Sequence, residues 1–480
     1  MLVGLGRATD DAEATELMTR ALLAAAADAG PAGLLAAIDR VAVPQGNWTY
    51  PDPARLVAAG VGARSARTHL VELGIPQQAL IDDALVSIMA GESDVAAVVG
   101  GEAMRWARGQ ARAGVDVDHI ETPQPGAAPD VVQRRPGPLM EQVEVVHRLW
   151  EPVQQYAMIE SALRAAEGRT LDSQRLETAR LWEAFNRVAR GNPHAAFPEP
   201  MEASAVDTPS ASNRPLAFPY NKWHATQWTV DQAAALILCS VEAAVRLGVD
   251  RDRWVFPLAG VESSHAVSLL RRKEPHRWPA MGVLGRAVAD RIGRPVAEAD
   301  VVEVYSCFPS AVQVQQRALG LDLSVVPTVT GGMTFAGGPF NNFVYQAMVE
   351  VVRRLRAEPG ALGVVTTVSG LLTKPGIGAW STRPDGRPPL VGDLASECQA
   401  ATTVVDVAET LDSYEGDGTV VTYTVTYDGM DPVRTVVLCD TPGGIRCVAV
   451  NDDAELAAYA TGHELIGEGV RVGRGSFSLS

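Results

Sequence analysis

Three side chains that could perform proton transfer or nucleophilic attack lie together near the end of a predicted strand. Tyr305, Ser306 and Cys307 follow the β-branched run 301–304, and a helical pattern comes next. Ligands of open α/β proteins bind at such strand ends. A thiol in this position could be a nucleophile, a proton carrier, or a small apolar side chain that fills space. The sequence therefore indicates a first candidate site here.

A second candidate site lies in the segment Gly337-Gly338-Pro339, which precedes the clearest helical pattern of the chain. Free backbone amides at a helix start can bind an oxyanion or a phosphate. Asn341 could donate a hydrogen bond to a ligand carbonyl, and asparagine is equally favourable as a helix-start residue. The segment predicts either an anion-binding helix start or a tight turn.

The elements that must position these residues fall into two sets of alternating strands and helices. The predicted strands are 2–6, 38–45, 69–73 and 95–103 in the first set, and 254–263, 301–307 and 362–370 in the second. Such alternation indicates mostly parallel sheets. Its recurrence is consistent with an internal duplication.

Two regions depart from this alternation. Residues 104–220 are rich in proline, arginine and tryptophan, which indicates an insertion, and 229–248 is either one long helix or a strand followed by a helix. After residue 405 the apolar residues alternate with period two between turn signals, with one short helical pattern at 454–460. This pattern predicts a small β-barrel, and the acidic stretch 413–418 is a plausible linker to it.

Length and composition exclude several classes of protein. A chain of 480 residues is long for a single core, so we expect two or more domains. We expect no membrane-spanning segment and no secretory signal. The five cysteines form no Cys-x-x-Cys pair, which indicates a reducing, cytoplasmic location without a structural zinc site. The net charge of −16 disfavours nucleic acids and anionic membranes as partners.

Several long motifs resemble those of the thiolase superfamily. They are GESDVAAVVGGEAM, TVDQAAALILCSVEAA, VVEVYSCFPSAVQ, TVTGGMTFAGGPFNN and SGLLTKPGIGAWSTRP. The group that they resemble most is the actinobacterial thiolase-like proteins of the acetyl-CoA acetyltransferase type, related to sterol-carrier-type thiolases. The resemblance covers most of residues 1–405, and the C-terminal region resembles the OB-like module that accompanies such proteins.

The resemblance implies an α/β fold with a duplicated five-layer αβαβα core and a small C-terminal OB-like β-barrel. The N-terminal thiolase half is expected at 1–253, with a loop-domain insertion at about 104–220. The C-terminal half is expected at 254–410 and the barrel at 411–480.

The catalytic residues of thiolases are mostly missing from the matching positions. The nucleophilic cysteine, which a thiolase keeps at a helix N-terminus, falls on or beside Gly74. Gly338 stands where the Gly-His-Pro loop has histidine, and Val368 where the Cys-x-Gly loop has cysteine. The His-Asp-Cys-Phe loop reads Tyr305-Ser306-Cys307-Phe308. Ordinary thiolysis or Claisen condensation is therefore not expected.

Three functions are compatible with the resemblance. The first is a divergent acyltransferase that handles acyl thioesters, with coenzyme A thioesters as expected substrates and no tightly bound cofactor or metal. The second is an aldolase in which Tyr305 transfers the proton, because thiolase-like aldolases of steroid side-chain degradation also have Tyr-x-Cys-Phe at this loop. The third is a catalytically silent acyl-CoA-binding or scaffold protein. Cys307 is accordingly an acid/base or nucleophilic group, a bystander to Tyr305, or a packing residue.

The resemblance also suggests further substrate-binding residues. Ser369 lies in the third loop, Lys374 follows it, and His224 lies where the family builds its acyl pocket, although a packed core histidine is an equally open interpretation. The basic run 271–277 could hold coenzyme A phosphates or be a solvated face. Gly337, Gly338 and Asn341 complete the predicted binding set.

Protein partners are expected through a sheet edge or the barrel. Thiolase cores commonly pair through a sheet edge, so a homodimer is one expectation, unless the added barrel blocks or replaces that contact. Residues 413–480 contain four arginines, no lysine and ten acidic residues, which is the wrong charge for a nucleic-acid groove. The barrel is therefore expected to cover the acyl site or to dock a partner.

Overall fold

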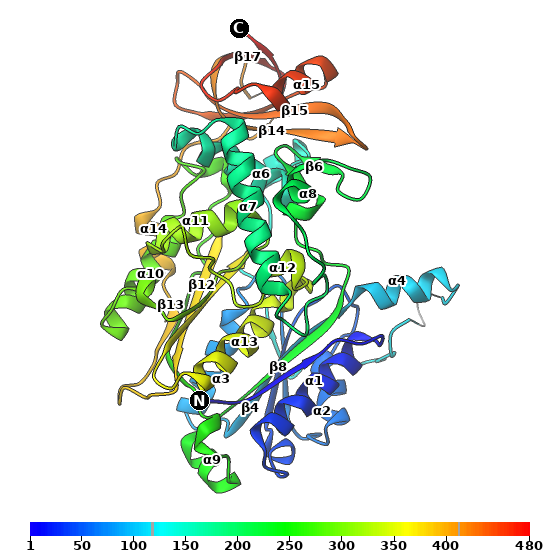
Figure 1. Cartoon of the computed structure of the whole chain (residues 1–480), viewed down its shortest axis with the longest axis vertical. Helices are drawn as coiled ribbons and strands as arrows, with labels where there is room; N and C mark the ends of the chain where they lie inside the picture. The colour runs from blue at the N-terminus through cyan, green and yellow to red at the C-terminus, as the bar shows by residue number, and fades with distance from the viewer. Residues whose placement is uncertain (117–119, 411–412) are drawn as a thin grey trace.

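The structure, a computed structural model, describes residues 1–116, 120–410 and 413–480. Two sheets enclose a layer of helices, further helices cover their outer faces, and a barrel lies at one end of the molecule (Figure 1). This αβαβα arrangement with an added C-terminal domain of strands confirms the predicted fold class. No helix in the described residues is long and apolar enough to cross a membrane.

The first sheet has six strands. In sheet order they are β1 (Leu2–Ala8), β8 (Asp231–Cys239), β4 (Val95–Ala103), β2 (Arg40–Pro44), β3 (Arg67–Val71) and β5 (Val131–Gln133). β8 runs antiparallel to both of its neighbours, and the other pairs are parallel. Helices α1 (Ala14–Ala29) and α2 (Pro53–Gly60) pack on its outer face.

The second sheet has five strands. In sheet order they are β10 (Val301–Glu303), β11 (Leu362–Ser369), β12 (Lys374–Ser381), β9 (Phe256–Glu262) and β13 (Leu390–Asp393). Its outer side carries helices α10 (Pro279–Ile292), α11 (Pro309–Leu319) and α14 (Ala395–Ala401). The candidate residues at 305–307 lie between the end of β10 and the start of α11.

The middle layer consists of helices α3 (Gln78–Met89) and α13 (Phe343–Ala357), each of which contacts both sheets. α3 approaches the second sheet closely because glycines lie beneath it. A Cβ atom at Gly260 would lie 1.9 Å from Asp82 Oδ1, and one at Gly378 would lie 2.9 Å from Gln78 Oε1. Since such distances are far below van der Waals contact, any larger residue would force the helix away from the sheet.

The insertion is mainly helical. Its helices are α4 (Met104–Arg112), α5 (Gln142–Val146), α6 (Pro152–Ala166), α7 (Leu171–Ala189) and α8 (Ala203–Asp207). The later helices lie between the core and the barrel, whereas α4 lies beside the first sheet (Figure 1). In Figure 1, α6 and α7 extend from the core toward the barrel. Thr422 of the barrel donates a hydrogen bond to the Met158 carbonyl (2.5 Å), and Arg164 forms an ion pair with Glu464 (2.7 Å). α6 therefore rests on the barrel at one end and reaches the core at the other.

The C-terminal strands close into a five-strand barrel around their own apolar core. The strands are β14 (Gly416–Asp428), β15 (Asp431–Asp440), β16 (Arg446–Asn451), β17 (Gly469–Gly473) and β18 (Ser476–Leu479), and the order around the barrel is β14-β15-β16-β18-β17. Helix α15 (Ala454–Gly462) lies between β16 and β17 and matches the predicted short helix. The predicted domain boundary at residue 411 lies outside the described residues.

Several predicted elements differ in detail. Residues 229–248 form the strand β8 and the helix α9 (Val241–Leu247), which is the second of the two predicted possibilities. β10 ends at Glu303, so Tyr305 and Cys307 lie in a loop rather than in the predicted strand. The helix predicted to open at Gly337 begins as a 3₁₀ turn at Phe340 and becomes α-helical at Phe343.

Candidate active site

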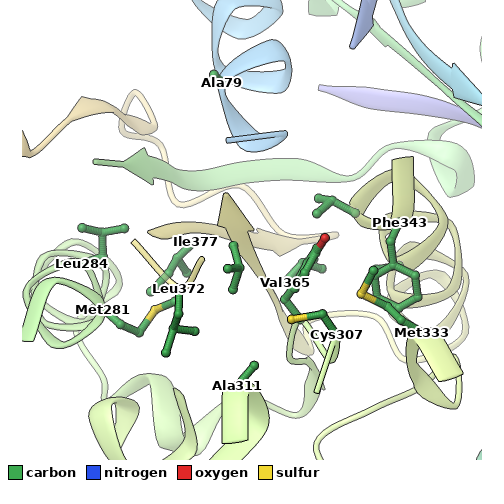
Figure 2. Close-up of a cluster of buried hydrophobic side chains, with 14 of the residues drawn as sticks. Ala79, Met281, Leu284, Cys307, Ala311, Met333, Phe343, Val365, Leu372 and Ile377 are labelled. Carbon is green, nitrogen blue, oxygen red and sulfur yellow. The ribbon is translucent and has the colours of Figure 1, made fainter. Parts of the chain in front are cut away.

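Cys307 lies in a tightly packed loop beneath the middle layer. Figure 2 shows its side chain among the apolar side chains of Met333, Phe343, Val365 and Leu372. It is 8% exposed, and burial raises the pKa of its thiol to about 12, although a hydrogen bond with the Tyr156 hydroxyl opposes this shift. The thiol is therefore protonated at neutral pH and is a weak nucleophile.

Tyr305 is buried against the starts of both middle helices. Its ring meets Phe343 edge-to-face with centroids 5.9 Å apart, and its hydroxyl hydrogen-bonds the side chain of Gln77, immediately before α3. Burial and the neighbouring Cys307 raise the pKa of Tyr305 above its usual value. The phenol is thus a proton donor at neutral pH and not a ready base.

Ser306 has a structural contact instead of an open face. Its Oγ accepts a hydrogen bond from the backbone N–H of Met333 (3.1 Å), and the residue is fully buried. This bond ties the loop at 305–307 to helix α12 (Gly332–Phe335), which leads into the Gly337-Gly338 segment.

The Gly337-Gly338 segment lacks free amides for an oxyanion at two of its positions. The N–H of Gly338 donates to the Gln227 carbonyl (3.0 Å), and that of Phe340 donates to the Gly338 carbonyl (2.7 Å). Gly337 has φ +97°, where glycine is favoured. Asn341 donates to the Gln45 carbonyl (3.1 Å). The geometry therefore favours the tight-turn interpretation of this segment.

The position that matches the thiolase nucleophile is closed. A Cβ atom at Gly74 would lie 2.4 Å from Leu139 Cδ2, and Gly74 has φ +100°. Lys374 donates a hydrogen bond to the Gly74 carbonyl, and burial together with Arg135 lowers the pKa of its ammonium group. Lys374 thus lies at this loop, as predicted from its place in the chain, but its ammonium group is engaged by backbone.

His224 and Ser369 lie in less reactive settings. Burial lowers the pKa of His224 to about 3, and its Nδ1 accepts a hydrogen bond from the Asn221 N–H (3.0 Å). This is the packed core histidine that the sequence left open. Ser369 ends β11, and its carbonyl accepts a hydrogen bond from Thr373 Oγ1 (3.2 Å). Neither side chain contacts Cys307 in the described residues.

Two residues that the sequence did not associate with Cys307 contribute to its surroundings. Tyr156, on α6, bonds the thiol and stacks on Phe308 with ring centroids 4.6 Å apart. Arg272 interacts electrostatically with Tyr156 and donates to the carbonyls of Leu371 and Leu372 in the third loop, while its Nη1 has no partner. Only the fold could reveal these residues, because they come from the insertion and from a loop after β9.

The basic run 271–277 is largely engaged within the protein. Arg271 pairs with Glu141 and Glu409, Arg272 is buried, and Arg277 pairs with Glu274. This favours a structural role over phosphate binding. Among the described residues, no group of three or more His, Cys, Asp or Glu is placed to hold a metal ion.

The comparisons with known proteins agree with the fold. The family model "Thiolase-like protein type 1 additional C-terminal domain" matches residues 397–475. The crystal structure of a monomeric SCP2-thiolase-like protein type 1 from Mycobacterium smegmatis matches 100% of this chain and 98% of its own, with a TM-score of 0.83 and 27% identity. The chain is a thiolase-like protein of the thiolase superfamily.

Other relatives of this thiolase-like protein share the fold at lower identity. An acetyl-CoA acetyltransferase from Syntrophomonas wolfei covers 80% of the chain, with 98% of its own length matched, a TM-score of 0.56 and 17% identity. An Ltp2-ChsH2(DUF35) aldolase also covers 80%, with 97% of its own length matched, a TM-score of 0.59 and 17% identity. No curated protein matches the sequence. At such identities these structures show the fold alone.

Proposed function

We propose that this thiolase-like protein handles acyl thioesters, with coenzyme A esters as the expected class, without forming an acyl-cysteine intermediate. A divergent acyltransferase of this kind passes the acyl group directly between two bound molecules. The observation that carries the proposal is the state of Cys307, which is buried, protonated at neutral pH and bonded to a tyrosine. No histidine hydrogen-bonds the thiol in the described part of the chain.

The loss of the other thiolase groups supports the same proposal. The backbone at Gly74 has φ +100°, which disfavours a residue with a side chain, and a side chain at 338 would meet Thr226. A fold can persist in this way after its chemistry has changed. The side chains around Cys307 are apolar, which matches the polarity of an acyl chain.

Aldol cleavage through Tyr305 is the second candidate. Its buried phenol stays protonated, and it lies between the starts of α3 and α13, where a donor could protonate a leaving enolate. The buried Arg272 guanidinium is near Tyr156 and could stabilise developing negative charge. A silent binding or scaffold role is what remains if neither chemistry is observed.

The C-terminal barrel, which we regard as OB-like, supports the site in this proposal. It holds α6, and α6 presents Tyr156 to Cys307. Its acidic surface fits a protein partner better than a nucleic acid. All five cysteines are buried and unpaired, which is compatible with the cytoplasmic location that we propose.

One experiment separates the three functions. The protein is incubated with a panel of acyl-CoA esters that includes β-hydroxyacyl-CoA esters. Intact mass is measured for adducts, free coenzyme A for acyl transfer, and the released ketone or aldehyde for aldol cleavage. We expect saturable binding without an adduct, and Cys307→Ala should bind within about twofold of the parent. Release of a ketone or aldehyde that disappears in Tyr305→Phe would assign the aldolase, and binding with neither product would assign the silent protein.

The same experiment has one outcome that would contradict the proposed function. An acyl adduct that forms on the parent and is absent from Cys307→Ala would show covalent transfer and overturn the proposal. Cys398→Ala is a matched control, because Cys398 is also buried and unpaired but lies on α14. It should leave the adduct pattern and the binding unchanged.

A further inference from the structure

A groove lies on the surface between α7, α11 and the segment 321–326, and none of the candidate site residues lines it. Its volume is about 280 Å³. Pockets for drug-sized ligands span roughly 300–1,000 Å³, so this groove suits a small amphiphile and is too small for an entire acyl-CoA.

One side of the groove is apolar. Leu181 and Ala184 come from α7, and Val326 comes from the segment after α11. Leu323 is 51% exposed and Val325 is 59% exposed on the opposite rim. Single exposed apolar residues are ordinary on a protein surface, but here they face one concave space and could cover a hydrocarbon chain.

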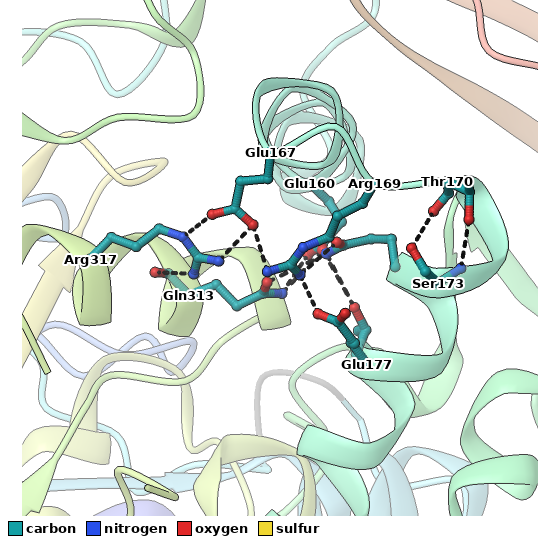
Figure 3. A network of polar contacts seen from close by, with 10 residues as sticks. Glu160, Glu167, Arg169, Thr170, Ser173, Glu177, Gln313 and Arg317 are labelled. Atoms are coloured by element: carbon teal, nitrogen blue, oxygen red, sulfur yellow. Dashed lines mark hydrogen bonds and ion pairs between the residues drawn. The ribbon is translucent and has the colours of Figure 1, made fainter. Parts of the chain in front are cut away.

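The other side of the groove carries arginines in an otherwise acidic chain. Figure 3 shows Arg169 between Glu167 and Glu177, and Arg317 against Glu167. These contacts fix two guanidinium groups and largely neutralise them. Arg180, one turn along α7, is exposed and forms no ion pair in the described part of the chain. It is therefore the uncompensated charge of the groove.

The floor of the groove is held rigidly from behind. Gln313 lines it and donates a hydrogen bond to the buried carboxylate of Glu160 (3.0 Å). Glu160 also accepts a hydrogen bond from the Tyr220 hydroxyl (2.6 Å), and that hydroxyl accepts one from the Ser310 N–H (3.0 Å) at the start of α11. A pre-formed floor of this kind reduces the entropy cost of binding a ligand.

We propose that this groove binds a medium-chain fatty acid, with the carboxylate on Arg180 and the hydrocarbon chain on the apolar side. An arginine pairs well with a carboxylate because its donors form a planar fork. The groove therefore suits a ligand with a single anionic head group and a short apolar tail. Its limited volume restricts the length of that tail. The proposal is independent of the acyl-thioester function, because it uses no residue of the Cys307 site.

The test is calorimetric titration of the full chain with dodecanoate below its micellar concentration, with 1-dodecanol and dodecyltrimethylammonium as uncharged and cationic comparators. We expect one dodecanoate per chain and much weaker binding of both comparators. Arg180→Ala should weaken dodecanoate binding roughly tenfold, as expected for a lost charge-assisted hydrogen bond. Leu323→Ser should also weaken it, through lost apolar contact.

Arg187→Ala is the matched control. Arg187 lies two turns further along α7, its side chain is 70% exposed, and it is outside the groove lining, so its loss should not change the affinity. Unchanged melting temperatures would show that the variants are folded, since both target side chains are exposed. Absence of dodecanoate binding, equal binding of 1-dodecanol, or undiminished binding by Arg180→Ala would each overturn the proposal.

Discussion

The methyl group of Thr226 occupies the space that a side chain at Gly338 would need. A Cβ atom at Gly338 would lie 2.1 Å from Thr226 Cγ2 and 3.2 Å from the Met333 carbonyl oxygen. The Thr226 hydroxyl also donates to the Cys307 carbonyl (3.0 Å). One threonine thus fills the place of the thiolase histidine and anchors the only cysteine retained from the family's catalytic set.

We predict that Gly338→Ala destabilises the protein, because the added methyl group overlaps Thr226. Overpacking of this kind costs about 1–3 kcal/mol. Thr226→Ser removes the interfering methyl group and keeps the hydroxyl that bonds Cys307. The double variant should recover part of the loss in free energy of unfolding, measured by urea denaturation. Equal destabilisation by Gly338→Ala in both backgrounds would contradict the steric explanation.

Arg446 should connect the stability of the barrel to the third loop. It is fully buried, pairs with Asp440 (2.8 Å), and donates to the backbone carbonyls of Arg272 and Lys273. Arg272 in turn holds the carbonyl of Leu371 (3.1 Å). Arg446→Met should cost about 2 kcal/mol in free energy of unfolding, since it leaves the buried carbonyls that Arg446 bonds without a donor. It should also speed hydrogen exchange at 369–373.

Arg434, a second arginine of the barrel, serves as the control for the prediction about Arg446. It pairs with Asp452 on the same barrel, but the carboxylate there is 65% exposed. Arg434→Ala should therefore cost less than about 1 kcal/mol and leave exchange at 369–373 unchanged. Exchange that rises equally in both variants would mean that the barrel does not act through Arg446.

Asp82 should make the protein less stable as pH rises. Burial raises the pKa of Asp82 to about 8, and only the Gln78 side chain opposes that shift. Between the unfolded pKa and pH 8 the unfolded chain loses this proton while the folded chain keeps it, so stability falls as pH rises. Asp82→Asn cannot ionise, and its stability relative to the parent should increase by up to about 4 kcal/mol between pH 5 and pH 8.

The neighbouring Asp83 should behave in the opposite way. Burial alone would raise its pKa, but His69 and Arg40 together hold that pKa below its usual value. The contribution of Asp83 to stability is present above the pKa that it has in the unfolded chain. It is lost as the pH falls through the pKa that Asp83 has in the folded protein. Asp83→Asn should therefore destabilise the protein at pH 7, by an amount that shrinks in acid. The midpoint of urea denaturation, measured at a series of pH values, tests both variants. If the midpoints of the parent and of Asp82→Asn change with pH in the same way, Asp82 does not titrate as predicted.

Most of the core could be predicted from periodicity and from the resemblance, because buried parallel strands and amphipathic helices leave strong patterns. The strands β5, β12 and β13 were not predicted, and β12 shows why. Its sequence, KPGIGAWS, reads as a turn, since glycine and proline disfavour strands. The glycines are there because α3 must pass directly above them, and that requirement comes from another part of the chain. The β character of this segment is therefore set by tertiary packing.

The candidate site at 305–307 stays a prediction, and its surroundings could not be predicted from the sequence. The sequence could not show that Cys307 is buried and protonated. That state depends on the surrounding apolar side chains, which are brought in from distant segments. Local motifs identify which residues a family uses, whereas burial and partners are properties of the assembled fold.

The chain should be a monomer, because it covers the outer edge of β3 with its own strand. β5 pairs in parallel with β3, and Asp130 at its start accepts a hydrogen bond from the Thr68 N–H (2.8 Å) and pairs with Arg55 (2.7 Å). A short strand in this position leaves little edge for a second chain. Light scattering coupled to size exclusion should give the mass of one chain at micromolar concentration, and Asp130→Ala should allow some dimer by loosening β5. A parent that elutes as a dimer would refute this prediction.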